Sequence, residues 1–347
     1  MTDDFSPLEY SWAWERTPKI RYSYESIGAE AGKPSDLFNR KRALENMDSL
    51  RGGVLQGADW SWFNAIVDMF YSSDAPSTIP SCSTPSDEVI SSPSSIFMAL
   101  EIGAEQTGGK AYLVPVKAEQ TGRSRLSVLS ETVQTLETTS ITLSAYPAVE
   151  TYMNRREEAG SPLHMIGVAV DCVDPSLSKL KIYLRAQETS FESVRSVLSL
   201  DGAIEPWSEE TLADLRELWR LVFGLDEDFS DSMELQSRTH ETAGMLYNFD
   251  IKANNTVPDT KVYIPVKHYG RNDKTIAEGV VAFMKQKGYP AEHTEGFLRA
   301  VNRLCGQHRQ LEDGSGLQTY VSCAVKKGRL SVTSYISPQV YHPGRWQ

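Results

Sequence analysis

The sequence predicts an α+β fold in which about ten antiparallel strands, arranged as five β-hairpins, close into a barrel surrounded by helices. Three observations support this prediction. Paired β-rich runs separated by turn-forming residues recur five times along the 347 residues. Apolar positions at helical spacing lie between the pairs. A twisted sheet of this many strands tends to curl, and closing it removes the exposed edges.

Each hairpin is predicted from two β-rich runs on either side of a turn-rich or polar connection. A barrel wider than about eight strands has room for more than side chains, so we expect a ligand chamber inside it. In chain order the pairs are Leu8–Trp14 with Lys19–Tyr24, Ile96–Ile102 with Lys110–Val116, Met165–Cys172 with Lys179–Arg185, Met245–Ile251 with Lys261–Val266, and Thr319–Val325 with Leu330–Ser337.

Helices are predicted between the hairpins, where they would pack on the outside of the sheet. The segment 72–95 is rich in Ser and Pro and predicts a surface loop. The helix signals are a Ser35 cap with Gly52 at the end, an apolar run at Trp60–Tyr71, a Ser208 cap with Gly224 beyond the end, and an apolar stripe from Ile276 to Met284 before Gly288.

The overall composition excludes several classes of protein. The net charge of -11 argues against a nucleic-acid partner, which usually requires a basic face. No run of 18 apolar residues is present, and the acidic start has no apolar segment typical of a signal peptide. The four cysteines form no C-x-x-C pair, so reduced thiols and a cytoplasmic location are expected.

Basic residues and tyrosines recur on the second strand of each hairpin. Because side chains alternate along a strand, the residues of each set share one face, while Leu180, Ile182 and Val262 point toward the helices. The polar face is therefore predicted to look into the barrel. The sets are Arg21, Lys110 with Tyr112, Lys179 and Lys181 with Tyr183, Lys261 with Tyr263, and Tyr335 with Tyr320 on its partner strand.

Several cations pointed into one enclosed space repel one another and lose hydration, so we expect an anion among them. A diphosphate fits, since lysine, arginine and tyrosine can all donate hydrogen bonds to its oxygens. The faces of the tyrosines can also stabilise a developing carbocation and shield it from water. A single Lys-x-Tyr is more often a solvated surface pattern. Its recurrence at three equivalent places favours a functional site.

Glu9 is the second candidate element, on the first strand of the first hairpin. A carboxylate inside the chamber can accept a hydrogen bond from an indole N–H or a phenol O–H, which raises the electron density of the ring. Taken alone, a glutamate near a terminus is usually a solvated surface residue.

Long ordered segments of this chain resemble the fungal dimethylallyltryptophan synthase family of aromatic prenyltransferases. They are PLEYSW with PKIRYSYE, GGKAYLVPVK, DPSLSKLKIYLR, LYNFDIK with KVYIPVKHYGRND, and TYVSCAVKKGRLSVTSYISPQVY. The resemblance implies a barrel of repeated αββα units, the ABBA fold, with the active site inside. It implies a dimethylallyl diphosphate donor, secondary metabolism of the indole alkaloid kind, and chemistry that needs neither metal nor cofactor.

The resemblance also assigns roles by motif. Glu9 in PLEYSW matches the acceptor-binding glutamate, and Lys110 and Lys181 are the cations expected to take part in catalysis together with it. Lys179 stands where the family often has arginine, and Lys261 where some members have glutamine. The remaining matches to diphosphate ligands and the tyrosine shield are Arg21, Tyr112, Tyr183, Tyr263, Tyr320 and Tyr335.

The chain also departs from the family pattern. The resemblance implies a helical region ahead of Glu9, and only a few residues precede Glu9 here, so we expect one domain over 1–347 that lacks this region. SSIFMALEI lacks the lysine of tryptophan-using members, and SPLHMIGVAV lacks an arginine for an amino-acid carboxylate. An indole alkaloid or cyclic dipeptide is therefore the expected acceptor. A phenolic or xanthone-type polyketide acceptor, a catalytically silent member and a cyclase remain as alternatives, and a homodimer is left open.

No metal site is predicted. The acidic segment Asp226–Asp231 resembles the D-D-x-x-D of metal-dependent isoprenoid enzymes, but it follows a helix end in a loop and no second acidic motif faces it. The six histidines lack H-x-x-x-H or H-E-x-x-H spacing.

Overall fold

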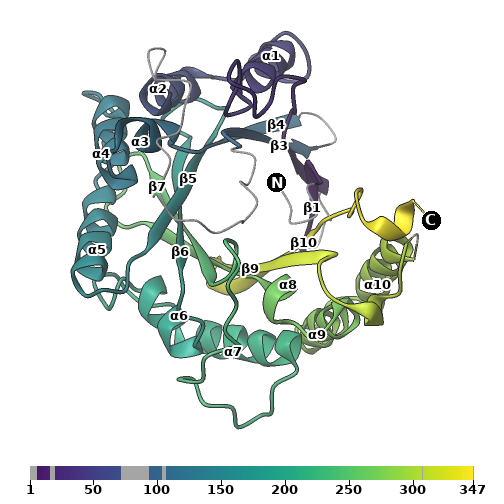
Figure 1. The fold of residues 1–347 in the computed structure, drawn as a ribbon. Coiled ribbons are helices and arrows are strands. Elements are labelled where there is room, and N and C mark those ends of the chain that lie inside the picture. Colours follow the sequence, from purple (N-terminus) through teal and green to yellow (C-terminus); the bar gives the residue numbers. More distant parts are fainter. Residues whose placement is uncertain (1–5, 16–19, 72–93, 104–106, 307, 347) are drawn as a thin grey trace. The chain divides into compact units, whose positions relative to one another are not determined.

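The computed structural model describes residues 6–15, 20–71, 94–103, 107–306 and 308–346. Its strands form a closed antiparallel barrel in the order β1-β10-β9-β8-β7-β6-β5-β4-β3-β2, with helices around it (Figure 1), which confirms the predicted fold class. The strands are β1 (Leu8–Ala13), β2 (Ile20–Tyr24), β3 (Ile96–Ile102), β4 (Thr107–Leu113), β5 (His164–Asp171), β6 (Lys179–Ala186), β7 (Met245–Lys252), β8 (Asp259–Ile264), β9 (Gln318–Lys326) and β10 (Arg329–Ile336).

Helices connect the hairpins, and two short 3₁₀ turns at Leu311–Asp313 and Pro343–Arg345 flank the last one. The helices are α1 (Arg40–Arg51), α2 (Ser61–Phe70), α3 (Val116–Thr121), α4 (Arg125–Leu136), α5 (Tyr146–Glu158), α6 (Phe191–Leu198), α7 (Glu209–Phe223), α8 (Val266–Tyr269), α9 (Asp273–Gln286) and α10 (Ala291–Cys305). None of the helices in the described ranges is long and apolar enough to cross a membrane.

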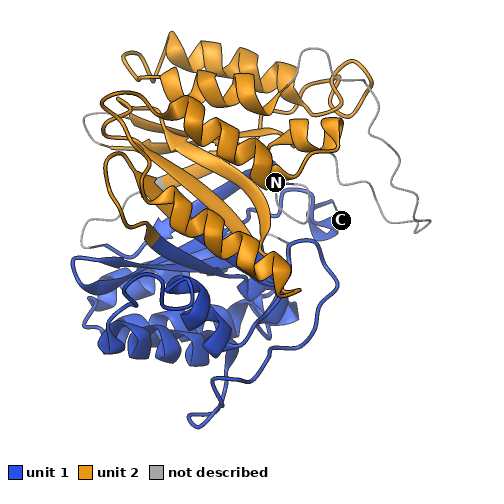
Figure 2. Ribbon diagram, turned by 90° about the vertical axis from the view of Figure 1, so that its left-hand side faces the viewer, with its two compact units in different colours: residues 1–20, 185–248, 260–347 blue, residues 21–184, 249–259 orange. Residues whose placement is uncertain are grey.

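The chain divides into two compact units, coloured separately in Figure 2. Unit 1 comprises Met1–Ile20, Arg185–Asn248 and Thr260–Gln347, and unit 2 comprises Arg21–Leu184 and Phe249–Asp259. The boundary runs through the middle of β7, near the end of β6 and after the first residue of both β2 and β8. The hairpin β9-β10 lies wholly in unit 1 and the hairpin β3-β4 wholly in unit 2.

Unit 1 is built on the ladder β1-β10-β9-β8, in which Ser11 pairs with Tyr335 and Tyr263 with Ser322. Helices α7 and α9 pack closely against each other in this unit. A Cβ on Gly279 of α9 would lie 2.4 Å from the carbonyl oxygen of Leu221 in α7, so only glycine permits this approach. Trp219 and Phe283 are among its fully buried side chains.

Unit 2 is built on the ladder β3-β4-β5, in which Lys110 lies directly opposite both Ala99 and Asp171. Helices α2 and α4 pack side by side within it (Figure 1). On β6, Leu180 and Ile182 are fully buried, as predicted for the face that meets the helices. Lys179 and Lys181, on either side of Leu180, occupy the opposite face and pair with Asp250 and Asp171, as the alternation predicted.

The strand predictions hold to within a few residues, with two instructive errors. The runs Lys110–Val116 and Lys261–Val266 were expected to stay extended to their ends, but both strands stop before a proline that begins a helix. Pro115 and Pro265 each occupy the N-cap position, where the missing N–H costs nothing.

The helix predictions are confirmed for α2, α7 and α9, and Ser208 caps α7 by accepting a hydrogen bond from the Thr211 amide. The Ser35 cap is wrong, because α1 begins after Asn39 and the Ser35 hydroxyl bonds Glu30 instead. Within the predicted loop 72–95, residues 72–93 lie outside the described part of the chain.

Candidate active site

Two of the predicted lysines meet at one carboxylate in unit 2. Asp171, at the end of β5, forms an ion pair with Lys181 of β6 and lies 3.7 Å from the Nζ of Lys110 on β4. The ladder explains the arrangement, since Lys110 and Asp171 are direct partners across β4 and β5. The side chain of Lys181 is 8% exposed, whereas those of Lys110 and Asp171 are about one-third exposed. The cluster is therefore reachable by a ligand.

A third lysine has a carboxylate of its own. Lys179 Nζ lies 3.2 Å from Oδ2 of Asp250 on β7. The charges of Lys179 and Asp250 also act on Asp171 and Lys181 respectively, so the five side chains form one electrostatic unit, hereafter the lysine cluster. Its members are Lys110, Lys179, Lys181, Asp171 and Asp250.

Burial and neighbouring charges set the protonation of this cluster. Burial, reinforced by the charge of Lys110, lowers the pKa of Lys181 to about 8, although Asp171 and Asp250 oppose that change. Burial raises the pKa of Asp171, but the ammonium groups of Lys181 and Lys110 outweigh it and hold that pKa below its usual range. The cluster thus combines three basic side chains with two acidic ones, one basic group in excess.

Arg21 lies elsewhere in unit 2. Its Nε donates a hydrogen bond of 2.5 Å to Glu101 Oε2 of β3, and both side chains remain about one-third exposed. In the same unit the predicted shield residues Tyr112 and Tyr183 come together, with ring centroids 5.8 Å apart. Arg21 is thus an ion-paired residue at the barrel's second strand, and its part in diphosphate binding stays a prediction.

The other three predicted tyrosines gather in unit 1, hereafter the tyrosine cluster. The Tyr263 ring centroid lies 5.6 Å from that of Tyr335 and 6.2 Å from that of Tyr320. Lys261 Nζ sits over the faces of Tyr263 and Tyr335, 4.6 and 5.9 Å from their centroids. These rings therefore already hold one cation against their π faces.

The Lys261 charge also affects the phenol of Tyr335. Desolvation raises the pKa of Tyr335, but the Lys261 ammonium and a hydrogen bond with Tyr263 outweigh it and lower that pKa. The carboxylate of Glu9 acts in the opposite direction on the same phenol. Glu9, Lys261 and Tyr335 are thus electrostatic neighbours, as expected for a carboxylate beside the tyrosine shield.

Glu9 lies on β1, and its Oε1 accepts a hydrogen bond of 2.5 Å from the Thr319 hydroxyl of β9. This bond fixes one carboxylate oxygen. The sequence prediction did not foresee Thr319 as a partner. A signal was available, because Thr319 directly precedes Tyr320 in the motif TYVSC.

Three functional candidates were missed from the sequence. Asp171 and Asp250 form ion pairs with the lysines. They lie on β5 and β7, the neighbours of the Lys-x-Tyr strand β6, and side chains on neighbouring strands alternate between the same two faces. Arg185 continues the series Lys179, Lys181, Tyr183 on β6, and it is 5% exposed. The same alternation that identified the lysines could have identified Arg185.

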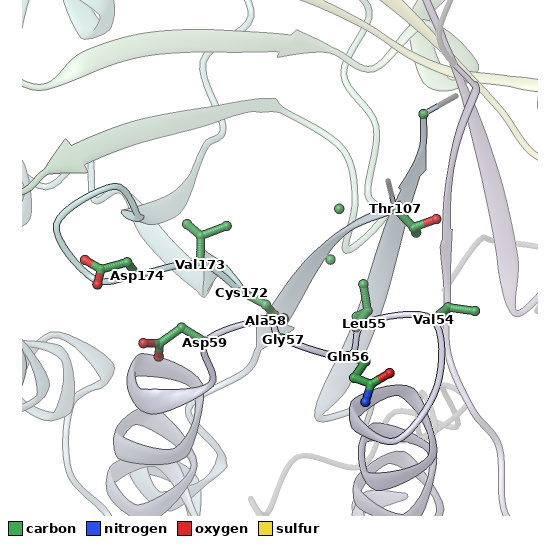
Figure 3. Close-up of a pocket in the computed structure, with 13 residues that line it drawn as sticks. Val54, Leu55, Gln56, Gly57, Ala58, Asp59, Thr107, Cys172, Val173 and Asp174 are labelled. Atoms are coloured by element: carbon green, nitrogen blue, oxygen red, sulfur yellow. The ribbon is translucent and has the colours of Figure 1, made fainter. Parts of the chain in front are cut away.

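A cavity of about 890 Å³ also opens in unit 2, but its walls contain none of the predicted site residues. Figure 3 shows the loop from Val54 to Asp59 beside Cys172, Val173 and Asp174. The wall of the cavity also includes Gly109, where a Cβ would clash with Leu55. The cavity is therefore separate from the residues of the lysine and tyrosine clusters.

Metal-ligating side chains do not gather in the part of the chain that the structure describes, where no three His, Cys, Asp or Glu converge. Asp231 of the acidic segment forms an ion pair with Arg216. Cys172, Cys305 and Cys323 are buried free thiols, and Cys82 lies outside the described residues.

Comparison of the chain with models of known protein families identifies its family. The model of the tryptophan dimethylallyltransferase family matches residues 1–300 of the chain. The chain belongs to this family. It is an aromatic prenyltransferase of the dimethylallyltryptophan synthase type, as the motifs around the lysines and tyrosines predicted.

Known relatives and solved structures agree with this assignment. The chain is 33% identical over 345 residues to a 4-O-dimethylallyl-L-tyrosine synthase of Claviceps purpurea, covering 98% of this chain and 75% of the relative. It is 30% identical over 354 residues to a 7-dimethylallyltryptophan synthase of Aspergillus fumigatus, covering 98% and 72%. The crystal structure of NotF in complex with brevianamide F and DMSPP matches with a TM-score of 0.77 and 19% identity, covering 96% of this chain and 80% of NotF. That structural likeness shows the fold.

Proposed function

We propose that this prenyltransferase transfers a dimethylallyl group from dimethylallyl diphosphate to an indole-containing acceptor in secondary metabolism, without a metal ion. The observation that carries the donor assignment is the lysine cluster. Three lysines held by two carboxylates present more positive than negative charge, and a diphosphate can replace or join those carboxylates as their partner. NotF, which shares the fold, is named as a complex with DMSPP.

The reaction begins with cleavage of the bond between the allylic carbon and the diphosphate oxygen, and the electron pair leaves with the diphosphate. Lys110, Lys179 and Lys181 stabilise the charge that accumulates on the leaving group, and Arg21 adds a further cation. The rings of Tyr112, Tyr183, Tyr263, Tyr320 and Tyr335 surround the resulting allyl cation. Lys261 supports this role, because an ammonium group already occupies the faces of two of these rings.

The acceptor ring then attacks the allyl cation, and a base removes the proton from the new tetrahedral carbon. Glu9 orients the acceptor by accepting a hydrogen bond from its N–H or O–H group, with the carboxylate held by Thr319. This bond makes the ring more electron-rich and so more nucleophilic.

A phenolic acceptor is the second candidate. The observation in its favour is the 33% identity to an enzyme named for attaching dimethylallyl to the oxygen of tyrosine. In that case the phenol oxygen attacks the allyl cation directly, and its proton passes to a base. Glu9 suits a phenol O–H as well as an indole N–H.

The decisive experiment incubates the protein with dimethylallyl diphosphate and a panel of indoles, cyclic dipeptides and phenols, in the presence of EDTA. Mass spectrometry should detect a product heavier than the acceptor by one dimethylallyl unit. Product from an indole supports the first candidate, and product from phenols alone supports the second. A folded protein that binds the diphosphate but yields no product with or without added Mg²⁺ would contradict the proposal.

A further inference from the structure

Arg185 is a buried cation that forms no ion pair with a carboxylate in the described part of the chain. It lies on β6 and is 5% exposed. None of its hydrogen bonds within the described residues reaches an acidic side chain; its partners are two backbone carbonyls and one phenol. A buried guanidinium normally has an anionic partner, because burial removes the hydration of its charge. Among the residues that the structure describes, Arg185 therefore lacks the anionic partner that a buried guanidinium normally has.

The free part of this guanidinium has a defined geometry. Nη1 is fully used, donating to the carbonyl oxygens of Thr242 at 2.6 Å and Ala243 at 3.3 Å. Nε has no hydrogen-bond partner among the described residues, and Nη2 reaches only the Tyr320 hydroxyl at 3.5 Å. The Nε–Nη2 edge is the edge that binds a carboxylate through two parallel hydrogen bonds. Arg185 thus presents a buried bidentate edge in which Nε is unpaired and Nη2 lies beside the Tyr320 hydroxyl.

A second cation lies at the same ring. Lys267 Nζ is 5.3 Å from the centroid of Tyr320, one of the proposed shield residues. Two positive groups therefore flank one tyrosine, which itself contacts the Tyr263 ring. An aromatic molecule that rests against these rings would bring any carboxylate of its own close to both cations.

The diphosphate is a poor explanation for this fork. Arg185 follows Lys181 by four residues on β6, which corresponds to about 13 Å along an extended strand. The lysine cluster already offers three cations at its own position on the sheet. An anion at Arg185 therefore belongs to a different group.

We propose that Arg185, assisted by Lys267 and the Tyr320 hydroxyl, is an anion-binding subsite for the carboxylate of the aromatic acceptor. The inference rests on the proposed function and narrows its acceptor to aromatic compounds that carry a carboxylate, as free aromatic amino acids do. It revises the sequence-based expectation that an amino-acid carboxylate has no arginine to bind it. That expectation considered residues 161–170, which include most of β5, whereas the arginine stands near the end of β6.

The loop around Gly244, which lies beside β6, should keep its structure when Arg185 is substituted. A Cβ on Gly244 would lie 2.1 Å from the Ala186 carbonyl oxygen, and the Gly244 amide donates to the Tyr269 hydroxyl at 2.8 Å. The loop is thus held beside β6 by contacts that do not involve Arg185. We expect Arg185→Gln and Arg185→Lys to fold, and circular dichroism with thermal melting verifies this.

The test compares matched acceptors that differ only in the carboxylate: L-tyrosine with tyramine, and L-tryptophan with tryptamine. For the wild type, the carboxylate-bearing member of at least one pair should show an affinity or KM about tenfold better, as two charge-assisted hydrogen bonds imply. Arg185→Gln should remove this preference, while its rate with the amine stays within a few-fold. Arg185→Lys should restore part of the preference, and the exposed Arg303→Gln is the control.

Binding by calorimetry separates this inference from the proposed function. If no acceptor of these pairs or of the wider panel of indoles, cyclic dipeptides and phenols is prenylated, but the wild type still prefers a carboxylate and Arg185→Gln does not, the subsite stands and the proposed function fails. The subsite is overturned if the wild type shows no carboxylate preference in affinity or KM for either pair, or if Arg185→Gln retains one. It is overturned equally if Arg185→Gln weakens binding of dimethylallyl thiolodiphosphate, because the fork would then serve the donor.

Discussion

The lysine cluster and the tyrosine cluster use the same Lys-x-Tyr pattern in opposite ways. In unit 2, Lys110, Lys179 and Lys181 are paired with two carboxylates, which balance only part of their charge. In unit 1, Lys261 is placed over aromatic faces instead. A cation paired with a carboxylate can exchange that partner for another anion. A ring face that holds an ammonium can hold another cation.

The difference shows how one strand motif supplies both halves of an ionisation reaction. The lysine cluster is suited to the diphosphate that leaves, and the tyrosine cluster to the carbocation that remains. Substitutions in the first cluster should therefore change donor binding and ionisation. Substitutions in the second should change the fate of the cation after the donor has bound.

The largest effect is expected from Lys181→Ala. Loss of a buried cation that stabilises the leaving group should lower kcat/KM for dimethylallyl diphosphate by about 10²–10³-fold, the usual range for one preorganised electrostatic contact. Steady-state kinetics measure this effect. The matched control is Lys285→Ala on the exposed side of α9, which should leave kcat/KM unchanged. Equal activity of Lys181→Ala and the wild type would rule out this role.

The next effect separates ring from hydroxyl in the tyrosine cluster. Tyr263→Leu should lower kcat by about 10–30-fold, since it removes a cation–π contact of up to about 2 kcal/mol, whereas Tyr263→Phe keeps the ring face and should stay within a few-fold. Chromatography should also show more dimethylallyl alcohol from the leucine variant, because water then reaches the cation. A phenylalanine variant as impaired as the leucine variant would assign the role to the hydroxyl.

A smaller effect is expected at the carboxylate that balances the lysines. Asp171→Asn should lower the Tm by a few degrees, since breaking a partly exposed ion pair costs about 1 kcal/mol. It should also enlarge the Tm increase produced by inorganic pyrophosphate, because the lysines then lack a competing anion. Asp214→Asn, in the surface pair with Lys287, is the control. An unchanged or smaller pyrophosphate response would show that Asp171 does not compete with the ligand.

The smallest effect is a change in pH dependence. Only the protonated form of Lys181 attracts the diphosphate, and its pKa is lowered to about 8, so protonation is lost as the pH rises through this value. The kcat/KM for the donor, which reports the free enzyme, should fall above about pH 8. Lys181→Arg should keep its positive charge, so the fall in kcat/KM should move to higher pH. Identical pH profiles of kcat/KM for the wild type and Lys181→Arg would mean that a group other than Lys181 causes the fall at high pH.

Much of the fold followed from the sequence because strand alternation is a local property. The hairpin partners, the outward face of Leu180 and Ile182, and the α7 cap all depend on residues close together in the chain. The errors arose where proline ended a strand early, at Pro115 and Pro265, and where Asn39 rather than Ser35 preceded the first helix. In each case a nearby residue, proline or asparagine, determined where the element ended or began, and the prediction had relied on a different residue.

The candidate site was predictable by residue type and less so by pairing. Alternation and motif identified the lysines and tyrosines, but Asp171, Asp250 and Thr319 became partners only through strand pairing distant in sequence. The single-domain expectation over 1–347, the cytoplasmic location and the homodimer stay predictions.

The most direct test of the account is a calorimetric titration of dimethylallyl thiolodiphosphate into the wild type, Lys181→Ala and Tyr263→Leu. The account predicts that Lys181→Ala binds this unreactive donor at least about tenfold more weakly, as loss of a charge-assisted contact implies, while Tyr263→Leu binds it like the wild type. Wild-type affinity in Lys181→Ala, or loss of donor binding in Tyr263→Leu alone, would contradict the assignment of the diphosphate to the lysine cluster and of the carbocation to the tyrosine cluster.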